Sequence, residues 1–373
     1  PYQSGKVALF AFFLLLSVAA FSFSGGWRSF WQASGAKWAL LVALLPLSYL
    51  LSAYVSGTLP HSYLGAGIDI DSVVFTTLAA LAFVFSFALF RTSRAVSLLL
   101  SVTFYSLFAA VIFQLVAITL GDVLVPFPLF SDPAVSLIGK WNDFGILVGL
   151  FLLLATIRLE FSTLSRVVKT GLLVCAVLAL VLSGFINFSL VWGLLITVCV
   201  ILVLFKLLQS PIAPDEQKSL NWRQHIPWLS GAVAILLLGF LFFGNAINAW
   251  LTSYFPVTAL EVRPSFSSTM DVIEAERGDS FPKLLVGSGP TTFADTWIAQ
   301  KPPEVNQSIF WNLDFVSGFS TAITAFGSVG IVGALMWLIA PLLILFAFLR
   351  ALRTTLFHSR EKALALACVM GSV

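Results

Sequence analysis

The sequence predicts an all-α, polytopic membrane protein, and three observations lead to this prediction. Hydrophobic residues make up 59% of the chain and charged residues 10%, whereas soluble domains average about 45–50% and about 25%. The mean hydropathy is +1.00. Apolar runs of about 20 residues, the length that an α-helix needs to cross a bilayer, recur along the whole chain. We therefore expect a helical bundle of about 10 spans with one large extracytoplasmic loop that contains short helices.

Complete spans are predicted at residues 7–24, 37–56, 72–90, 95–120, 142–157, 168–184, 187–207, 227–250 and 327–349. A tenth apolar run begins at Ala363 and no Met opens the chain at Pro1, so we expect the sequence to be part of a longer protein. The predicted organisation is 1–254 with spans one to eight, 255–317 as a loop domain, and 318–373 with spans nine and ten, the last of them incomplete. The first run has no cleavage site of small residues and is not interpreted as a signal peptide.

The distribution of charge predicts the orientation. If the spans alternate across the membrane, 14 of the 20 Lys and Arg residues fall in one set of loops, and 13 of the 17 acidic residues fall on the other side. Short cytoplasmic loops carry an excess of Lys and Arg, so the loop 255–317 is predicted to be extracytoplasmic. The net charge of +3 is the sum of two opposed faces and predicts no binding of nucleic acid.

The first half of the polar loop is predicted to form a helix over 265–276. Ser267 or Ser268 stands near its start, and Gly278 ends it. A short apolar run, Leu284 to Val286, then leads into the turn Gly287-Ser-Gly-Pro290.

The second half of the loop is predicted to begin with another helix, starting at Thr291 or Thr292. Pro302-Pro303 breaks the chain again, because proline interrupts regular structure. The segment 315–326, which is apolar or small, returns to the membrane.

Two basic sites are candidates for binding anionic groups. Lys140 lies at the outer mouth of the fifth span with Trp141, Asn142 and Asp143, which predicts either an outward-facing cavity or an interfacial helix start with a snorkelling lysine. Arg263 precedes the first helix of the loop, where a guanidinium can form bidentate hydrogen bonds to phosphate. Pairing of Arg263 with Glu261 on the surface is the alternative.

The remaining candidates lie in the loop after its first helix. Backbone N–H groups of the turn at Gly287 and Gly289 are candidates for holding an anion. Asp295, Lys301 and Asp314 follow in a stretch that contains Trp311 and other aromatic residues. Carboxylates beside aromatic faces suit sugar rings, and aromatic residues equally suit a membrane interface.

The sequence predicts no cofactor, metal or disulfide. The histidines, His61, His225 and His358, are scattered over both predicted faces, and no pair has the spacing of a metal site. The cysteines, Cys175, Cys199 and Cys368, all lie in apolar runs, where small buried side chains are expected.

Together, the many spans and the late outer loop resemble the O-antigen ligase family. The resemblance in specific residues rests on Arg263, the run Leu285-Val-Gly-Ser-Gly-Pro-Thr-Thr-Phe293, the helix entry Ser328-Val-Gly-Ile-Val-Gly333, and Ile138-Gly-Lys-Trp-Asn-Asp143. It implies a type C glycosyltransferase of the bacterial cytoplasmic membrane. Such an enzyme moves a glycan, without a metal, from a polyprenyl (undecaprenyl) diphosphate carrier to a lipid, glycan or protein acceptor at the outer face.

Under this resemblance, Arg263 and Lys140 stabilise the leaving diphosphate. Substrate contacts are expected from Asn142, Asp143, Gly287, Gly289, Asp295, Lys301 and Trp311. The sequence departs from the family where a His-Asn pair usually precedes the Gly-x-x-Gly helix entry, because Phe319-Ser320 stands there. Three interpretations follow: Asp314 acts on the acceptor hydroxyl, the acceptor chemistry differs, or this branch has lost activity.

Two other functions are open on the sequence. A polymerase that extends one lipid-linked glycan with another would share the donor and the fold. A transporter or flippase for a polar or lipid-linked solute would carry charged residues inside its spans and show repeat symmetry. Spans three, four, six and seven have no charged residue in their apolar cores, so chemistry at the outer surface is the favoured prediction.

Overall fold

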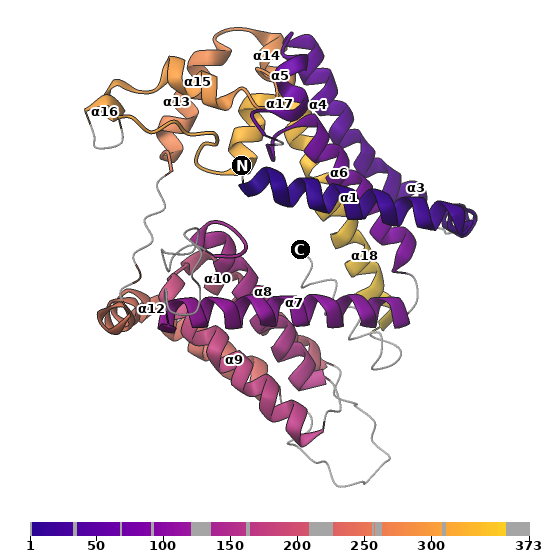
Figure 1. The fold of residues 1–373 in the computed structure, drawn as a ribbon, viewed down its shortest axis with the longest axis vertical. Coiled ribbons are helices and arrows are strands. Elements are labelled where there is room, and N and C mark those ends of the chain that lie inside the picture. The colour runs from indigo at the N-terminus through magenta and orange to yellow at the C-terminus, as the bar shows by residue number, and fades with distance from the viewer. Residues whose placement is uncertain are drawn as a thin grey trace. The chain divides into compact units, whose positions relative to one another are not determined.

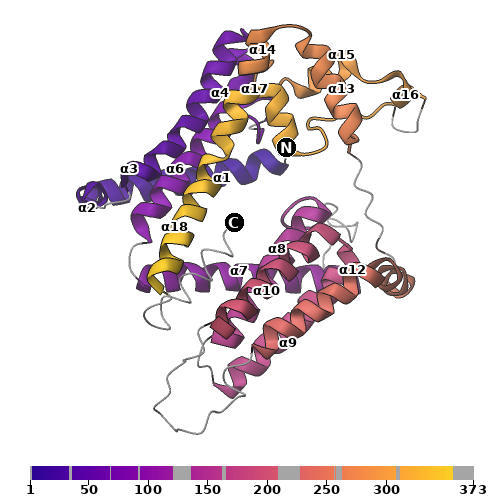
Figure 2. The same cartoon turned by 180° about the vertical axis from the view of Figure 1, so that it is seen from behind.

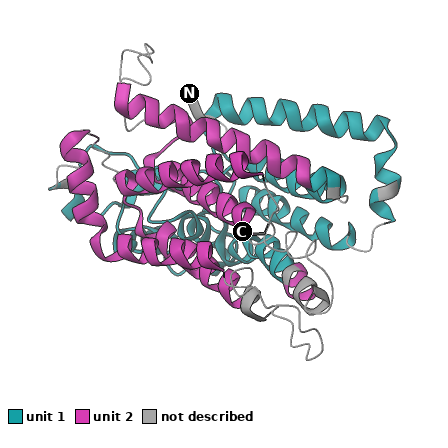
Figure 3. Cartoon of the chain, turned by 90° about the horizontal axis from the view of Figure 1, so that it is seen from below, with its two compact units in different colours: residues 1–96, 262–345 teal, residues 97–261, 346–373 magenta. Residues whose placement is uncertain are grey.

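A computed structural model describes residues 2–32, 36–67, 69–90, 93–120, 136–161, 165–208, 227–255, 257, 263–307 and 311–355. Every regular element in these ranges is a helix. The chain divides into two compact units (Figure 3). The first comprises Pro1–Val96 with Val262–Leu345, and the second comprises Ser97–Glu261 with Phe346–Val373. The outer loop therefore belongs to the same unit as the first three predicted spans, and we describe each unit by itself.

Seven helical segments in the described ranges are long and apolar enough to cross a membrane. They are Ser4–Phe23, Ala36–Val55, Arg94–Leu120, Trp141–Glu160, Arg166–Ile186, Trp228–Tyr254 and Thr321–Ala347. Two shorter apolar helices, Val73–Leu89 and Ser189–Leu204, fall where spans three and seven are predicted. The prediction of a helical, multi-pass membrane protein is thus confirmed, whereas the count of about 10 spans stays a prediction.

Unit 1 is built around α4 (Leu44–Val55), which packs against both α6 (Val73–Leu89) and α17 (Thr321–Trp337) (Figures 1 and 2). Their shared core consists of Leu45, Tyr49, Ala53, Val73, Ala325 and Val329. The chain reaches α4 through α1 (Tyr2–Phe23), α2 (Gly26–Trp31), α3 (Ala36–Ala39) and η1 (Leu40–Ala43). After α17 it continues into α18 (Ile339–Thr355), which belongs to unit 1 only up to Leu345. Residues more than 230 positions apart in the sequence thus share one core.

Four short helices form the outer loop of unit 1. They are α13 (Phe266–Arg277), α14 (Phe281–Val286), α15 (Phe293–Gln300) and α16 (Pro303–Asn306). The Ser265 side chain caps α13 and Gly278 ends it, which confirms the helix predicted over 265–276; the capping serine is Ser265 and not Ser267 or Ser268. The second predicted helix is also confirmed, since α15 starts after Thr292. α14 and α16 were not predicted as helices, and α16 begins at Pro303, where the sequence predicted a break. Val272, Ile273, Phe293 and Trp297 form a small core between α13 and α15.

The contacts within unit 1 agree with helices that alternate across a membrane. α5 (Leu59–Leu64), which lies in the loop between spans two and three, contacts the long loop through Ser62 and Pro290. Near the N-terminus, the Ser4 hydroxyl bonds to the carbonyl of Gly67 in the loop that follows α5. A separate cluster packs Phe30, between spans one and two, against Ala88 near the end of α6. Three segments predicted to lie outside therefore meet at one end of this unit.

Unit 2 contains α7 (Ser93–Leu120) from Ser97 onward, and α8 (Trp141–Phe161), α9 (Arg166–Ile186), α10 (Ser189–Leu208) and α12 (Trp228–Tyr254). The link between α9 and α10 is a single turn at Asn187, whose φ is 52°. Asn248 on α12 donates to the carbonyls of Gly184 and Phe185 at 3.1 and 2.8 Å. These carbonyls belong to the last turn of α9, where no intrahelical donor is available. A side chain of one span thus satisfies the end of another.

Candidate functional site

The site is organised by a break in α17 at Gly330, where φ is 66° and ψ is −168°. A break leaves the carbonyls before it without their usual helical donors. Two of them, those of Gly327 and Ser328, accept hydrogen bonds from the N–H groups of Ser288 at 3.1 Å and Gly289 at 2.8 Å. The Gly287–Pro290 turn is therefore joined to the broken helix by its backbone.

Glycine is required on both sides of this junction. A Cβ atom at Gly287 would overlap the carbonyl of Ser328, and one at Gly330 would overlap the carbonyl of Leu285. Both residues also have positive φ, of 76° and 66°, which L-residues with side chains rarely adopt. The two motifs at 285–293 and 328–333 that suggested a family resemblance are thus complementary halves of one structural feature, which we call the turn–helix junction.

Helix α4 supports the junction through the buried Ser52, whose hydroxyl donates to the carbonyl of Ser328 at 3.0 Å. We expect Ser52→Ala to lower the free energy of unfolding by about 1 kcal/mol, because a buried interhelical hydrogen bond is lost. Ser48→Ala is the matched control, since the buried Ser48 hydroxyl bonds only within its own helix, to Leu45 at 2.7 Å. Chemical unfolding of both variants in mild detergent measures the difference. Equal effects of the two substitutions would contradict a supporting role for Ser52.

Asp71, which lies just before α6, holds the end of the turn at Thr291. Its carboxylate accepts from the N–H of Thr291 at 3.2 Å and from the hydroxyl of Tyr49 at 3.0 Å. The indole of Trp337 donates to the same Tyr49 hydroxyl at 2.9 Å. The Ser328 hydroxyl lies against the carboxylate as well. One half-buried carboxylate thus joins α4, α6, α17 and the turn.

The pKa of Asp71 is raised above its usual value. Burial is the main cause, because it withdraws the carboxylate from water, and the negative charge of Asp69 adds to the effect. The hydrogen bonds from Ser328, Thr291 and Tyr49 act in the opposite direction without cancelling the burial. The sequence offers one signal for such a group, an Asp directly ahead of an apolar run, but that signal does not name its partners.

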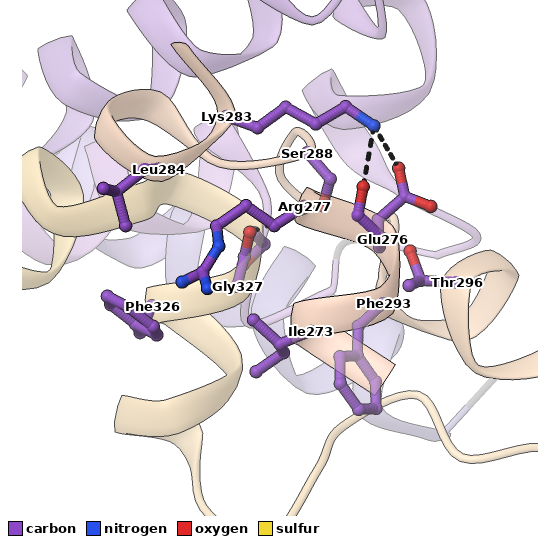
Figure 4. A pocket seen from close by; sticks show the side chains of 11 residues that line it. Ile273, Glu276, Arg277, Lys283, Leu284, Ser288, Phe293, Thr296, Phe326 and Gly327 are labelled. Carbon is purple, nitrogen blue, oxygen red and sulfur yellow. Dashed lines mark hydrogen bonds and ion pairs between the residues drawn. The ribbon is translucent and has the colours of Figure 1, made fainter. Parts of the chain in front are cut away.

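A small cavity with a volume of about 20 Å³ lies beside the turn, next to Ser288 (Figure 4). That is enough for about one water molecule. Its polar lining includes Ser288, Thr296 and Arg277. In Figure 4 the guanidinium of Arg277 lies between Leu284 and Phe326, and the described residues offer it no hydrogen-bonding or ionic partner. Lys283, by contrast, pairs with Glu276 at 2.8 Å. Arg277 was not among the predicted site residues.

Arg263 lies at the point where two helices of unit 1 begin. Its guanidinium carbon is 4.8 Å from the centroid of the Phe319 ring, and Nη1 donates to the Phe319 carbonyl at 3.4 Å. Ser265 then caps α13 and Ser320 caps α17. The buried Thr269 connects the two starts, because its hydroxyl oxygen accepts from the N–H of Phe319 at 2.9 Å. Arg263 itself is exposed, so an anionic group has access to it.

The other predicted residues of the loop have mixed surroundings. Asp314 is exposed and makes no hydrogen bond or ion pair with a described residue. Asp295 lies 3.9 Å from the imidazole of His61 on α5. Lys301 donates to the carbonyl of Trp311 at 2.8 Å, which ties the end of α15 to the returning chain. The N–H of Gly289 is used in the turn–helix junction, and the N–H of Gly287 ends α14 by bonding to Lys283 at 2.8 Å.

Lys140, Asn142 and Asp143 lie in unit 2, at the start of α8. Lys140 and Asp143 are exposed and Asn142 is half-buried. Asp143 stands in the first turn of α8, where a negative charge is favourable to the helix dipole. The preceding turn is closed by Ser136, whose hydroxyl donates to the carbonyl of Gly139 at 3.0 Å. Their local structure is that of a well-formed helix start with an accessible lysine.

No protein-family model, curated protein or solved structure matches this chain. Among the residues that the structure describes, no group of three or more His, Cys, Asp or Glu side chains is placed to hold a metal ion. The candidate site therefore rests on its own geometry: the turn–helix junction, the Asp71 network, the cavity with Arg277, and Arg263 beside Phe319.

Proposed function

We propose that this protein transfers a glycan from a polyprenyl diphosphate carrier to an acceptor hydroxyl at the extracytoplasmic face of a bacterial cytoplasmic membrane. One observation supports this function above the others. The resemblance to O-antigen ligases singles out Arg263 and the position of Phe319 as functional sites 56 residues apart, and in the structure the two residues are in contact. The motifs that support the resemblance also join to each other at the turn–helix junction.

The chemistry requires stabilisation of a leaving diphosphate. The acceptor oxygen forms a bond to the anomeric carbon of the donor sugar, the bond from that carbon to the diphosphate oxygen breaks, and the carrier keeps the electron pair. Arg263 is suited to the resulting charge because it is exposed, bidentate and held against an aromatic ring. The N-termini of α13 and α17 beside it add positive potential.

The acceptor hydroxyl loses its proton in the same reaction, and a carboxylate is suited to receive it. Asp314 is an exposed carboxylate with no other described partner, five residues before Phe319. We assign it this role in place of the missing imidazole. Asp295 and Trp311 are proposed to contact the substrates. Lys140, Asn142 and Asp143 lie in unit 2, and their roles stay predictions of the sequence. A polymerase that uses a lipid-linked glycan as its acceptor would use the same residues.

Reconstituted protein supplied with a polyprenyl diphosphate glycan and candidate acceptors, without divalent metal, tests this function. We expect transfer by the wild type and a decrease of about 10²–10³-fold in Arg263→Ala, the loss seen when one charge-stabilising donor is removed. Arg263→Lys should recover little, because an ammonium offers neither the fork geometry nor the same stacking on Phe319. Arg28→Ala, on the predicted cytoplasmic side, is the control and should leave transfer unchanged.

Full transfer by Arg263→Ala would show that the site is wrongly assigned. Movement of the lipid-linked glycan across the vesicle membrane with no new glycosidic product would instead indicate a flippase. Each result is obtained from the same preparation, since product formation and donor accessibility can be measured in parallel.

A further inference from the structure

The turn at 287–292 has two sides with different surroundings. On one side Ser288 lines the cavity, where its hydroxyl lies 3.0 Å from that of Thr292. On the other side the N–H of Thr291 donates to Asp71 at 3.2 Å. A movement of Thr291 therefore displaces Ser288, which lies three residues earlier and lines the cavity.

Thr291 requires such support because its φ is 63°. The left-handed region is unfavourable for L-residues and especially for β-branched ones. Two further hydrogen bonds help to hold the segment: Ser62 donates to the carbonyl of Pro290 at 2.8 Å, and the Thr291 hydroxyl donates to the carbonyl of His61 at 3.4 Å. Only the bond to Asp71 has an ionisable acceptor, and when this carboxylate is charged the bond is about twice as strong as a neutral one.

Asp71 is itself fixed from several elements. Tyr49 on α4 donates to it, Trp337 on α17 fixes Tyr49, and Ser328 on α17 lies against the carboxylate. The negative charge of Asp69 in the same loop acts on Asp71, and no described cation pairs with Asp71. A half-buried carboxylate without a counter-ion is costly to keep, so packing alone does not explain it.

We propose that Asp71 is a positioning residue that holds Thr291 in its left-handed conformation and so fixes Ser288 and the start of α15 at the cavity. The effect on the turn follows from the geometry alone, whereas the effect on catalysis rests on the proposed function. In glycan transfer, Asp71 acts through the turn and does not contact the reacting atoms.

The direction of the pKa shift gives this role a distinct signature. The native pKa of Asp71 is raised, so the folded protein binds the proton more tightly than the unfolded chain does. The contribution of this group to stability is therefore greatest at low pH and is lost as the pH rises through the native pKa. Asp71→Asn, which keeps the shape without the charge, should leave the unfolding midpoint at neutral pH unchanged or higher.

The test introduces Ser288→Cys into a protein whose three native cysteines are replaced by alanine, and measures labelling by a membrane-impermeant maleimide. We expect Asp71→Asn to raise the labelling rate at Ser288→Cys about tenfold, the factor that corresponds to the loss of about one charge-assisted bond. Adding Thr291→Asn should reverse much of this increase, because asparagine tolerates positive φ and depends less on Asp71. Ser267→Cys, at an exposed position on α13, should label at one rate in all variants.

Faster labelling with an unchanged or raised midpoint supports positioning. Unchanged labelling at Ser288→Cys would overturn the proposal, and faster labelling with a lowered midpoint would reduce Asp71 to an ordinary structural residue, which overturns it too. In the transfer assay, Asp71→Asn should lower the rate about tenfold with no loss of stability. If the wild type shows no transfer, the proposed function fails while the labelling result still decides the role of Asp71.

Discussion

Gly330→Ala should separate the loop from α17 and destabilise unit 1 by about 2–6 kcal/mol. Two costs add. A side chain at this φ and ψ costs of the order of 1–3 kcal/mol, because the conformation is almost confined to glycine. The new Cβ also overlaps the backbone of Leu285, which has no flexible end to move away, and overpacking of this kind costs about 1–3 kcal/mol. Thermal or chemical unfolding in detergent measures the sum.

Two other glycines of unit 1 serve as graded controls. Gly25 has a positive φ of 71° but open space around it, so Gly25→Ala carries a conformational cost without an overlap. Gly5 lies in α1, and a Cβ added there would meet no atom within 4 Å, so Gly5→Ala carries neither cost. We expect the loss in free energy of unfolding to be largest for Gly330→Ala, smaller for Gly25→Ala and smallest for Gly5→Ala. A Gly330→Ala protein as stable as Gly25→Ala would show that the turn–helix junction is not tightly packed.

Asp314→Asn should lower glycan transfer by about 10²–10⁴-fold, the usual contribution of a positioned general base. The amide keeps the size of the side chain but does not accept the proton of the acceptor hydroxyl. Because Asp314 is exposed and has no described partner, its replacement should leave the free energy of unfolding unchanged. The lower transfer rate then reflects the reaction itself and not unfolding. Initial rates at saturating donor and acceptor measure it.

Phe319→His in the Asp314→Asn background tests whether the two positions are interchangeable. The imidazole would stand beside Arg263 and near the start of α17, and both the guanidinium and the helix N-terminus disfavour its protonation. A neutral imidazole is a competent base near neutral pH, so we expect partial recovery of transfer. Full activity of Asp314→Asn alone would instead indicate that the acceptor chemistry needs no base at this carboxylate.

The sequence predicts the local elements of this chain well. Apolar length alone locates the long helices α1, α4, α6 to α10 and α12, because in a bilayer each spanning segment must satisfy its own backbone. It does not locate the short helices α2 and α5. Within the outer loop, Ser265 and Gly278 mark the ends of α13 by capping and by positive φ, both of which are properties of single residues. α14 was not anticipated, because six residues are too few for a periodic pattern to appear.

The pairing of elements is not visible in the sequence, and the site depends on that pairing. The run with Gly287 predicts a turn and the run with Gly330 predicts a helix entry. Neither pattern predicts that the two runs contact each other. Asp71 and Thr291 are 220 residues apart and are joined only because α4, α6 and α17 share a core. The sequence does not distinguish Arg277 from the other charged residues of α13. In the structure Lys283 pairs with Glu276, and Arg277 lines the cavity without a described partner.

Unit 1 consists of two chain segments that are separated by most of unit 2, and this sets the order in which its parts are synthesised. A chain is synthesised from its N-terminus, so α4 and α6 enter the membrane long before α17 exists. Until then Tyr49, Ser52 and Asp71 lack the partners that Trp337, Ser328 and Thr291 later supply. All of unit 2 up to Glu261 is made during that interval. The outer loop and α17 thus reach α4 and α6 only after that stretch has been made, and only then can Trp337, Ser328 and Thr291 complete the hydrogen bonds of the early part of unit 1.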